Sequence, residues 1–264
     1  MNDLENFLKC LSNYREKFNA LIGSHEHTIN NCLELETLID EYSHFIINTR
    51  NKEIWGKLQQ QEHYDLKQLA VSLREKSAFC VAIMEKYRAL KLLTGVAEIT
   101  DYFKNIESCI EKEFGSFQIT SDSKVLLVGS GSFPMTPILI AKRTGAEVVG
   151  IDIDDEAIEL GLNVVERLGA GLNIRLERVP VENLDFTKDA THIIFSSTVK
   201  DKYNILEQLH TLTNENVVVA IRYGDQLKSL FNYPSREVDK QKWNKVDDIL
   251  RPDDVFDIEL YQKV

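Results

Sequence analysis

The chain has 264 residues, of which 43% are hydrophobic, and this is enough for one large or two small packed domains. Its formal net charge of −11 comes without any cluster of Lys and Arg, which argues against nucleic acid as a partner. No apolar run approaches the roughly 20 residues that span a bilayer, and no basic region precedes an apolar one at the N-terminus. We therefore expect no membrane segment and a cytoplasmic location.

Residues 1–115 have the apolar spacing of a helical bundle. Apolar side chains recur every three or four positions, and the stretch contains no Pro and few Gly. The clearest runs are Phe7 to Leu21, Leu35 to Ile46, Leu66 to Leu93 and Ile99 to Phe114. The pattern predicts an N-terminal helical domain over residues 1–115.

The cysteines and histidines give no sign of a metal or of disulfides. The four cysteines are far apart and occupy helix-like apolar positions, which is typical of reduced core thiols: Cys10, Cys32, Cys80 and Cys109. His25 and His27 lie close together, but no nearby Cys or His supplies further ligands at the usual zinc spacing. We expect no native metal site.

After residue 115 the pattern changes to short apolar runs that alternate with helix-like stretches. The runs are Val125 to Val128, Glu147 to Ile151, Ile174 to Val179, His192 to Phe195, Val217 to Ile221 and Val255 to Leu260. This alternation predicts an α/β domain over residues 116–264, with a parallel, Rossmann-like sheet covered by helices. Ligands bind such sheets beyond the carboxyl ends of the strands.

The first of these strands runs into a glycine-rich turn, Val128-Gly129-Ser130-Gly131, which precedes a helix expected to begin near Thr136. Such a turn lets the backbone approach a nucleotide-like ligand at a helix N-terminus. A dinucleotide site and an S-adenosylmethionine site both use it, and a purely structural turn remains an alternative. The dinucleotide fingerprint requires a third Gly where this chain has Pro134, which favours S-adenosylmethionine.

An acid follows the second strand at a position suited to ribose hydroxyls. Asp152 is the candidate, with Ile153 beside it; the alternative role for Asp152 is capping the next helix, which Asp154 would serve equally well. The turn that ends at Val181 and Glu182 lies where adenine is usually held, and Ser197 follows the fourth strand. These residues predict one site at the strand ends.

Several segments resemble the nicotianamine synthase family over nearly the whole chain. Val128-Gly-Ser-Gly-Ser-Phe-Pro-Met-Thr136 resembles the family's Val-Gly-Ser-Gly-Pro-x-Pro-x-Thr, and Ile221-Arg-Tyr-Gly-Asp-Gln-Leu-Lys-Ser-Leu-Phe-Asn-Tyr-Pro234 resembles its Leu-Arg-Ser-Ala-His-Gly-x-Arg-x-Phe-Leu-Tyr-Pro. In the helical part, Ile83-Met-Glu-Lys-Tyr87 is similar to Leu-Glu-x-His-Tyr/Phe, and Asp101-Tyr102 to Asn-Tyr. The match is most specific at the glycine turn.

The resemblance implies a class I S-adenosylmethionine-dependent transferase that moves the 3-amino-3-carboxypropyl (aminobutanoyl) group onto an amine and releases 5′-methylthioadenosine. It implies Glu85 as the catalytic base and Tyr102 as an orienting residue, with the helical domain as a lid; a solvated acid and a packing tyrosine are the alternatives. Arg222 would clamp a carboxylate or pair with Asp225. The implied cofactor-binding residues are Gly129, Ser130, Gly131, Pro134, Met135, Asp152, Ile153, Val181, Glu182 and Ser197, and the implied substrate-binding residues are Ser132, Phe133, Arg222 and Tyr223.

Departures from the plant-type pattern at Ser132 and at Tyr223-Gly224-Asp225 point to a different acceptor pocket. The chain also resembles the bacterial branch that makes opine-type metallophores such as staphylopine and pseudopaline. In that branch histidine is the acceptor, and a partner opine-type dehydrogenase completes the product. We expect histidine, with the D-enantiomer favoured, and a homodimer is compatible with this family. Nicotianamine synthesis from S-adenosylmethionine alone, an ordinary methyltransferase and a non-catalytic sensor are the alternatives.

Overall fold

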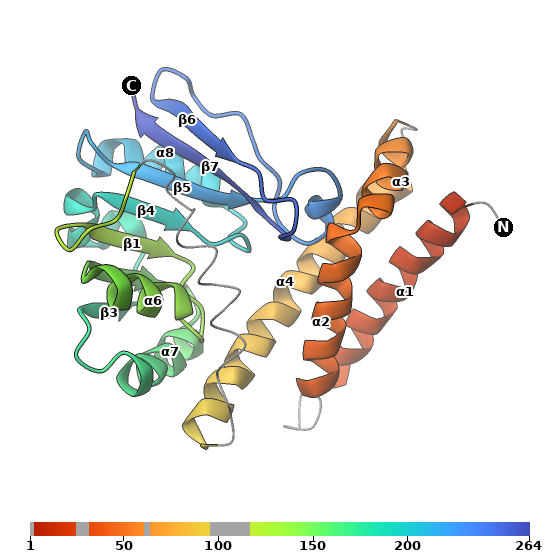
Figure 1. Ribbon diagram of the computed structural model, residues 1–264, viewed down its shortest axis with the longest axis horizontal. Coiled ribbons are helices and arrows are strands. Elements are labelled where there is room, and N and C mark those ends of the chain that lie inside the picture. The colour runs from red at the N-terminus through yellow and green to blue at the C-terminus, as the bar shows by residue number, and fades with distance from the viewer. Residues whose placement is uncertain (1–2, 25–31, 61–63, 96–116) are drawn as a thin grey trace. The chain divides into compact units, whose positions relative to one another are not determined.

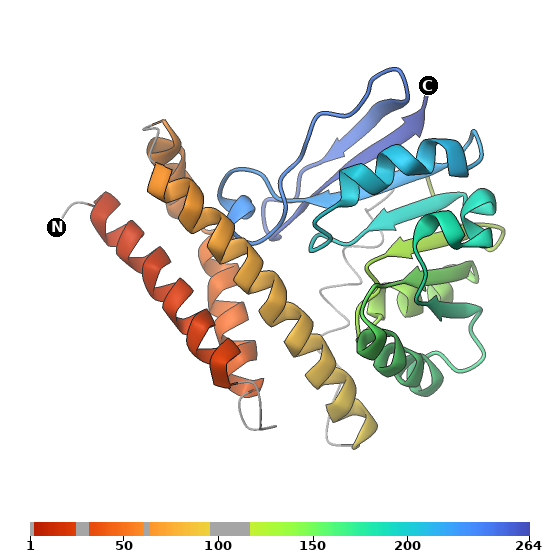
Figure 2. The ribbon, with the colours of Figure 1, turned by 180° about the vertical axis from the view of Figure 1, so that it is seen from behind.

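The computed structural model describes residues 3–24, 32–60, 64–95 and 117–264 (Figures 1 and 2). Its helices are α1 (Asp3–Ser24), α2 (Cys32–Ile47), α3 (Thr49–Gln59), α4 (Tyr64–Leu93), α6 (Met135–Thr144), α7 (Asp155–Leu168) and α8 (Lys202–Leu212). Its strands are β1 (Lys124–Val128), β2 (Glu147–Ile151), β3 (Ile174–Glu177), β4 (His192–Phe195), β5 (Val218–Tyr223), β6 (Trp243–Ile249) and β7 (Asp257–Lys263). Short 3₁₀ turns are η2 (Val181–Asn183), η3 (Asp185–Asp189) and η4 (Gln226–Leu230).

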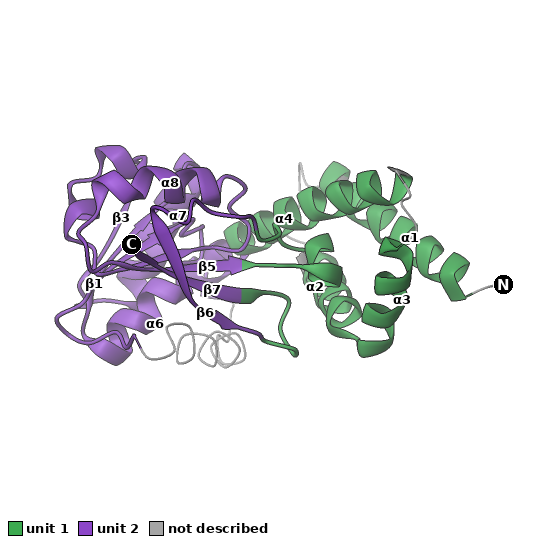
Figure 3. Ribbon diagram, turned by 90° about the horizontal axis from the view of Figure 1, so that it is seen from above, with its two compact units in different colours: residues 1–87, 223–235, 251–257 green, residues 88–222, 236–250, 258–264 purple. Residues whose placement is uncertain are grey.

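The chain forms two compact units that are interleaved along the sequence (Figure 3). The helical unit comprises residues 1–87, 223–235 and 251–257, and the sheet unit comprises residues 88–222, 236–250 and 258–264. The sequence pattern predicts a single domain boundary near residue 115. In the structure, two later segments, residues 223–235 and 251–257, also belong to the helical unit. Helix α4 contributes its first part to one unit and its last residues to the other.

The helical unit is held together by the apolar faces that the spacing predicts. Phe7, Leu11 and Phe18 of α1 are buried in one cluster with Tyr42 of α2 and Trp55 of α3. The sequence pattern missed α3, because this helix offers few apolar residues. Its start is fixed by Asn48, whose side chain accepts a hydrogen bond of 3.1 Å from the Asn51 N–H. Among the described helices none is long and apolar enough to cross a bilayer.

The segment after β5 packs inside the helical unit. The Tyr42 hydroxyl donates to the Leu230 carbonyl at 2.9 Å, and the Arg74 Nε donates to the Ser229 carbonyl at 2.7 Å. The buried Lys228 ammonium pairs with the Asp257 carboxylate at 2.6 Å, and burial lowers the pKa of this lysine. The first two contacts bind η4 to α2 and α4, and the ion pair joins η4 to the first residue of β7.

Two of the four cysteines have described side chains, and both are free thiols. Cys80 is buried in the core of the helical unit, where burial raises the pKa of its thiol to about 12. Cys10 is half-buried in α1. A buried thiol with a high pKa is unreactive, which agrees with the predicted reduced core cysteine at position 80.

The sheet unit contains a seven-stranded sheet of order β3-β2-β1-β4-β5-β7-β6. Strands β3, β2, β1, β4 and β5 pair in parallel, with Val128 opposite Ile151 on one side and Phe195 on the other. The predicted α/β architecture is confirmed, but the sheet is mixed because β6 pairs with β7 in antiparallel orientation. Most side chains of β6 are at least partly exposed, so it carries no apolar run that the sequence pattern could detect.

Helices cover both faces of this sheet. Leu206 and Leu209 of α8 pack in one cluster with Leu126 and Val128 of β1. Ile138 of α6 belongs to another cluster, which includes Leu160 and Val164 of α7 and Ala89 and Leu92 at the end of α4. In Figure 3, α8 and α6 lie on opposite sides of the sheet. Because β1, β2, β4 and β5 pair in parallel, their carboxyl ends share one edge of the sheet, and this is the edge at which the ligand site is predicted.

Candidate active site

The glycine turn after β1 has a backbone that only glycine adopts easily. Gly129 and Gly131 have φ values of 85° and 66°. A Cβ atom at Gly129 would lie 2.5 Å from Cγ2 of Val199 and 3.1 Å from Cβ of Ser196. The loop that follows β4 thus lies directly against the turn. The N–H groups of Gly129 and Ser130 both donate to the Ile151 carbonyl, at 2.9 and 3.0 Å, which fixes the turn to the end of β2.

Asp152 joins the glycine turn to the end of β2 through its carboxylate. Its Oδ2 accepts a hydrogen bond of 2.9 Å from the Gly131 N–H, and its Oδ1 accepts from the N–H groups of Ile153 and Asp154 at 2.8 and 3.2 Å. Capping of α7 is the role of Asp154, whose Oδ1 accepts from the N–H groups of Glu156 and Ala157. The capping alternative for Asp152 is therefore wrong. Its carboxylate holds the loop with three of about four lone-pair sites, and the site that remains, on Oδ2, can accept from a further donor.

Ile153 lies beside this carboxylate with 90% of its surface exposed. Val181, in η2, is buried, and its carbonyl accepts a hydrogen bond of 2.8 Å from the Thr187 hydroxyl. Glu182 is exposed in the same turn.

Most predicted side chains in the glycine turn itself are buried. Ser130 packs against Gly150 of β2, where a Cβ atom would lie 2.8 Å from the Ser130 Cβ. Ser132 and Pro134 are also buried, and Phe133, only 6% exposed, packs with Met135 in the cluster that includes α7. These buried side chains support the shape of the loop. The groups that the loop offers to a ligand are therefore mainly those of its main chain and of the first turn of α6.

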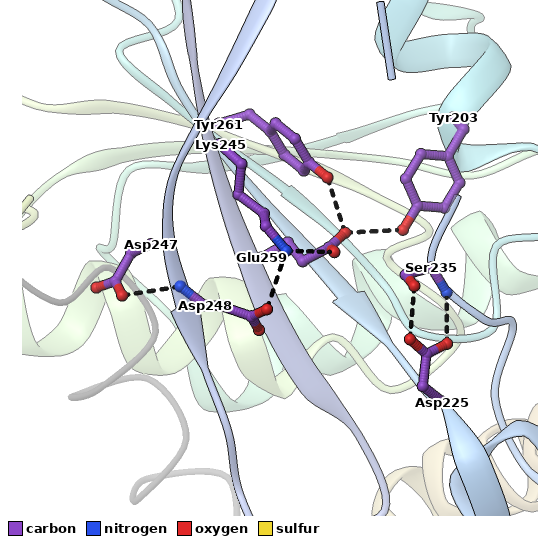
Figure 4. A network of polar contacts seen from close by, with 8 residues as sticks. All are labelled: Tyr203, Asp225, Ser235, Lys245, Asp247, Asp248, Glu259 and Tyr261. Carbon is purple, nitrogen blue, oxygen red and sulfur yellow. Dashed lines mark hydrogen bonds and ion pairs between the residues drawn. The ribbon is translucent and has the colours of Figure 1, made fainter. Parts of the chain in front are cut away.

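Arg222 reaches this first turn from the end of β5. Its Nη2 lies 3.5 Å from the Thr136 hydroxyl oxygen, and its side chain is half-buried. Asp225, its alternative partner, accepts hydrogen bonds from the Ser235 N–H and hydroxyl at 2.9 and 2.6 Å (Figure 4). A guanidinium beside a helix N-terminus is a favourable place for a carboxylate. The next residue, Tyr223, is buried.

The two predicted catalytic residues come from the N-terminal part of the chain. Glu85 is half-buried in α4, and Tyr102 lies outside the described residues. His25 and His27 lie outside them as well. Among the residues that the structure does describe, no group of three or more His, Cys, Asp or Glu side chains is arranged to hold a metal ion.

Sequence reasoning missed two polar features of the sheet unit. The first is Lys202, the first residue of α8, whose ammonium donates to the carbonyls of Ser197 and Arg222 at 2.9 and 2.6 Å. Hydrogen bonds to carbonyl oxygens leave no pattern of residue types, so no sequence signal marks this lysine.

The second missed feature is the buried carboxylate of Glu259 in β7 (Figure 4). Glu259 accepts hydrogen bonds from the hydroxyls of Tyr203 and Tyr261 at 3.0 and 2.9 Å, and from the Lys245 ammonium at 3.2 Å. Burial, together with the Glu259 charge, raises the pKa of both tyrosines. This cluster joins α8, β6 and β7.

Comparison with known proteins agrees with this geometry. A family model described as a methyltransferase domain matches residues 119–254. L-histidine 2-aminobutanoyltransferase from Yersinia pestis is 32% identical over 189 residues, which cover 70% of this chain and 69% of that protein. A protein of the same name from Pseudomonas aeruginosa strain UCBPP-PA14 is 29% identical over 178 residues, which cover 67% and 68%.

The crystal structure of MtNAS, a nicotianamine synthase, in complex with MTA and tNA shares the fold. Its TM-score is 0.76 at 14% identity, with 98% of each chain covered. A mutant of MtNAS in complex with S-adenosylmethionine has a TM-score of 0.69 at 14% identity and covers 95% of this chain and 98% of its own. The predicted class I S-adenosylmethionine-dependent fold is confirmed.

Proposed function

The chain belongs to the family of L-histidine 2-aminobutanoyltransferases, built on a methyltransferase-type domain, and from this premise we propose that it transfers the aminobutanoyl group of S-adenosylmethionine to the α-amine of histidine. The observation that carries the proposal is the sequence similarity to curated relatives of that name. The strand-end geometry supports it, because a glycine turn, an acid and an arginine converge there.

The reaction is a substitution at carbon. The neutral amine of the acceptor donates its lone pair to the aminobutanoyl methylene carbon that is bonded to the sulfonium, so that a C–N bond forms as this C–S bond breaks. The electron pair of that bond goes to sulfur, 5′-methylthioadenosine leaves, and the amine loses one proton. The methyl carbon and the ribose C5′ carbon are bonded to the same sulfur, and the methyl carbon is the least hindered of the three toward an amine. The protein must therefore choose the carbon by positioning the amine.

The donor side of the site is proposed to form around the glycine turn. Gly129 and Gly131 give the turn the positive-φ backbone that places its main chain against the donor, and Asp152 accepts a hydrogen bond from the ribose through its remaining lone-pair site. Ile153 packs on adenine, with the turn at Val181 beside it. The other proposed cofactor-binding residues would act mainly through their main-chain groups and through the shape of the loops: Ser130, Pro134, Met135, Glu182 and Ser197.

The carboxylate of the aminobutanoyl group is proposed to bind between Arg222 and the N-terminus of α6. The Arg222 guanidinium lies beside Thr136, so it and the N–H groups of the first turn of α6 can donate hydrogen bonds to the same carboxylate. Attachment of this end of the donor orients the methylene carbon toward the acceptor. Ser132, Phe133 and Tyr223 are proposed to shape the acceptor side, and their burial fits a role in shape.

Glu85 and Tyr102 are proposed for proton removal and for orientation of the amine, on the family resemblance of their segments. The α-amine of a free amino acid is largely protonated near pH 7, and only its neutral form has the lone pair. A carboxylate that takes up this proton supplies the neutral amine at the moment of attack. The helical part of the chain is proposed as the lid that excludes water from the sulfonium.

The remaining proposals concern the acceptor and the setting. We propose L-histidine as the acceptor, because the curated relatives carry that name, with the D-histidine expected from the resemblance as the competing enantiomer. The product is proposed to pass to an opine-type dehydrogenase in metallophore synthesis. A cytoplasmic location suits both amino-acid-derived substrates, and a homodimer is proposed as the assembly.

A product assay by mass spectrometry tests the proposal. The protein is incubated with S-adenosylmethionine and either L-histidine, D-histidine or no acceptor. Methylthioadenosine together with a histidine adduct heavier by one aminobutanoyl unit supports the transfer, and the tube that contains it identifies the enantiomer. Product without an acceptor would point to nicotianamine synthesis. S-Adenosylhomocysteine would identify a methyltransferase and contradict the proposal.

A further inference from the structure

Lys202 is a fully buried lysine at the carboxyl edge of the sheet. Its exposed fraction is 0%, and its ammonium donates to the carbonyl oxygens of Ser197 and Arg222 at 2.9 and 2.6 Å. It is also the first residue of α8, where the helix dipole disfavours a positive charge. The buried ammonium at this end of the helix is held by the groups that accept its hydrogen bonds, among them these two carbonyl oxygens.

The two carbonyls belong to neighbouring strand ends. Ser197 follows β4 and Arg222 lies in β5, and these strands pair in parallel with Phe195 opposite Ile221. One ammonium has three N–H donors on a compact centre, and it can therefore bond to the ends of two strands at once. Lys202 fixes the orientation of both peptide groups at the edge where the ligand is proposed to bind.

Each fixed peptide group leads to a part of the proposed donor site. The loop after Ser197 contacts the glycine turn, since the Val199 side chain occupies the space that a Cβ at Gly129 would need. The Arg222 side chain extends to Thr136 in the first turn of α6. A change in the peptide orientation at Arg222 would redirect its guanidinium away from this turn.

We propose that Lys202 is a positioning residue that acts through Arg222: by holding the Arg222 carbonyl, it directs the guanidinium to the carboxylate of the aminobutanoyl group. This inference rests on the proposed function. It makes a prediction about ligands, because S-adenosylmethionine carries that carboxylate and 5′-methylthioadenosine does not. Lys202 should therefore contribute to the binding of the first and little to that of the second.

The test compares the affinities of the wild type and the Lys202→Met variant for these two compounds by calorimetry. Loss of a well-placed charged hydrogen bond corresponds to about tenfold or more in affinity. We expect the S-adenosylmethionine affinity of the variant to fall by about tenfold or more, and the methylthioadenosine affinity to stay within about threefold. The matched control is Lys200→Met, an exposed lysine two residues earlier, which should leave both affinities unchanged.

A double variant tests whether Lys202 acts through Arg222. Arg222→Gln alone should cause the same selective loss, and the Lys202→Met, Arg222→Gln double variant should bind S-adenosylmethionine no more weakly than Arg222→Gln alone. Additive losses would overturn the proposal, and so would equal losses for both compounds in Lys202→Met.

If the Met variant does not fold, Lys202→Gln takes its place in the same comparison with the same expected selective loss, because the shorter, uncharged amide cannot reach the Ser197 and Arg222 carbonyls together. Failure of both variants to fold would assign the lysine to stability alone and overturn the inference. Failure of the proposed function shows instead in the wild-type product assay, so the two failures are distinguishable.

Discussion

Replacement of Gly129 by alanine tests whether the loop after β4 really lies against the glycine turn. Two costs are expected. The φ of 85° is unfavourable for alanine by about 1–2 kcal/mol. The new Cβ would also meet Val199 Cγ2 at 2.5 Å and Ser196 Cβ at 3.1 Å, and overpacking of this kind costs about 1–3 kcal/mol. The sum predicts destabilisation by about 2–5 kcal/mol.

The chain offers a matched control at Gly171. Its φ is 82°, and a Cβ there would meet no atom within 4 Å. Gly171→Ala therefore carries the backbone cost without the steric one, and the effect of alanine on the unfolded chain is the same in both variants. Urea unfolding of the three proteins gives the difference, with calorimetry for S-adenosylmethionine affinity. Gly171→Ala should keep that affinity and Gly129→Ala should lose it. Equal destabilisation by the two substitutions would refute the close contact.

Three further predictions address catalysis, donor binding and pH. Glu85→Gln should lower turnover by about 10²-fold or more with little change in donor affinity, as expected for loss of a general base, and steady-state kinetics with calorimetry measures both. Asp152→Ala should weaken S-adenosylmethionine binding by about 1.5–3 kcal/mol in calorimetry, because the carboxylate holds the loop and is proposed to bind the ribose as well. Burial lowers the pKa of His192, so the unfolded chain binds more protons than the folded one below about pH 6.5. Unfolding free energy should therefore fall from pH 7.5 to 5.5 in urea titrations, and His192→Gln should reduce that fall.

Each of these predictions has a control or a contradicting result. Unchanged turnover in Glu85→Gln would remove that residue from the site. Asp154→Ala is the control for Asp152, since it should cost about 0.5–2 kcal/mol of stability as a lost helix cap while leaving donor affinity intact. If Asp152→Ala binds S-adenosylmethionine as tightly as the wild type, Asp152 only supports the loop and does not bind the donor. If the unfolding free energy of His192→Gln falls between pH 7.5 and 5.5 as much as that of the wild type, other groups cause the acid sensitivity.

Much of the sheet was predictable because its strands are buried on both faces. The runs from Val125 to Val128 and from Ile193 to Phe195 are continuous and apolar, as is typical of central parallel strands. Strand β6 was missed because it lies at the edge and exposes charged side chains such as Asp247 and Asp248. The packing of η4 in the helical unit depends on single contacts such as that of Tyr42 with Leu230, which no periodicity encodes.

The candidate site was predictable where chemistry requires a residue type at a fixed place. Gly129 and Asp152 follow strands, and the structure joins the glycine turn to Asp152 by a hydrogen bond at Gly131. The contribution of Lys202 was not predictable, because its partners are carbonyl oxygens that every residue has. Burial of Phe133 was equally hidden, since an aromatic residue in a loop is compatible with ligand contact and with packing.

The most direct test of the transfer uses a doubly labelled donor. S-Adenosylmethionine with ¹³C in its S-methyl group and ¹⁵N in its amino group is incubated with the protein and L-histidine, and the products are separated by mass spectrometry. Aminobutanoyl transfer predicts a histidine adduct that has gained ¹⁵N without ¹³C, and methylthioadenosine that retains ¹³C. A histidine product that carries ¹³C, formed together with S-adenosylhomocysteine that retains ¹⁵N, would show that the methyl group moves and would rule out aminobutanoyl transfer.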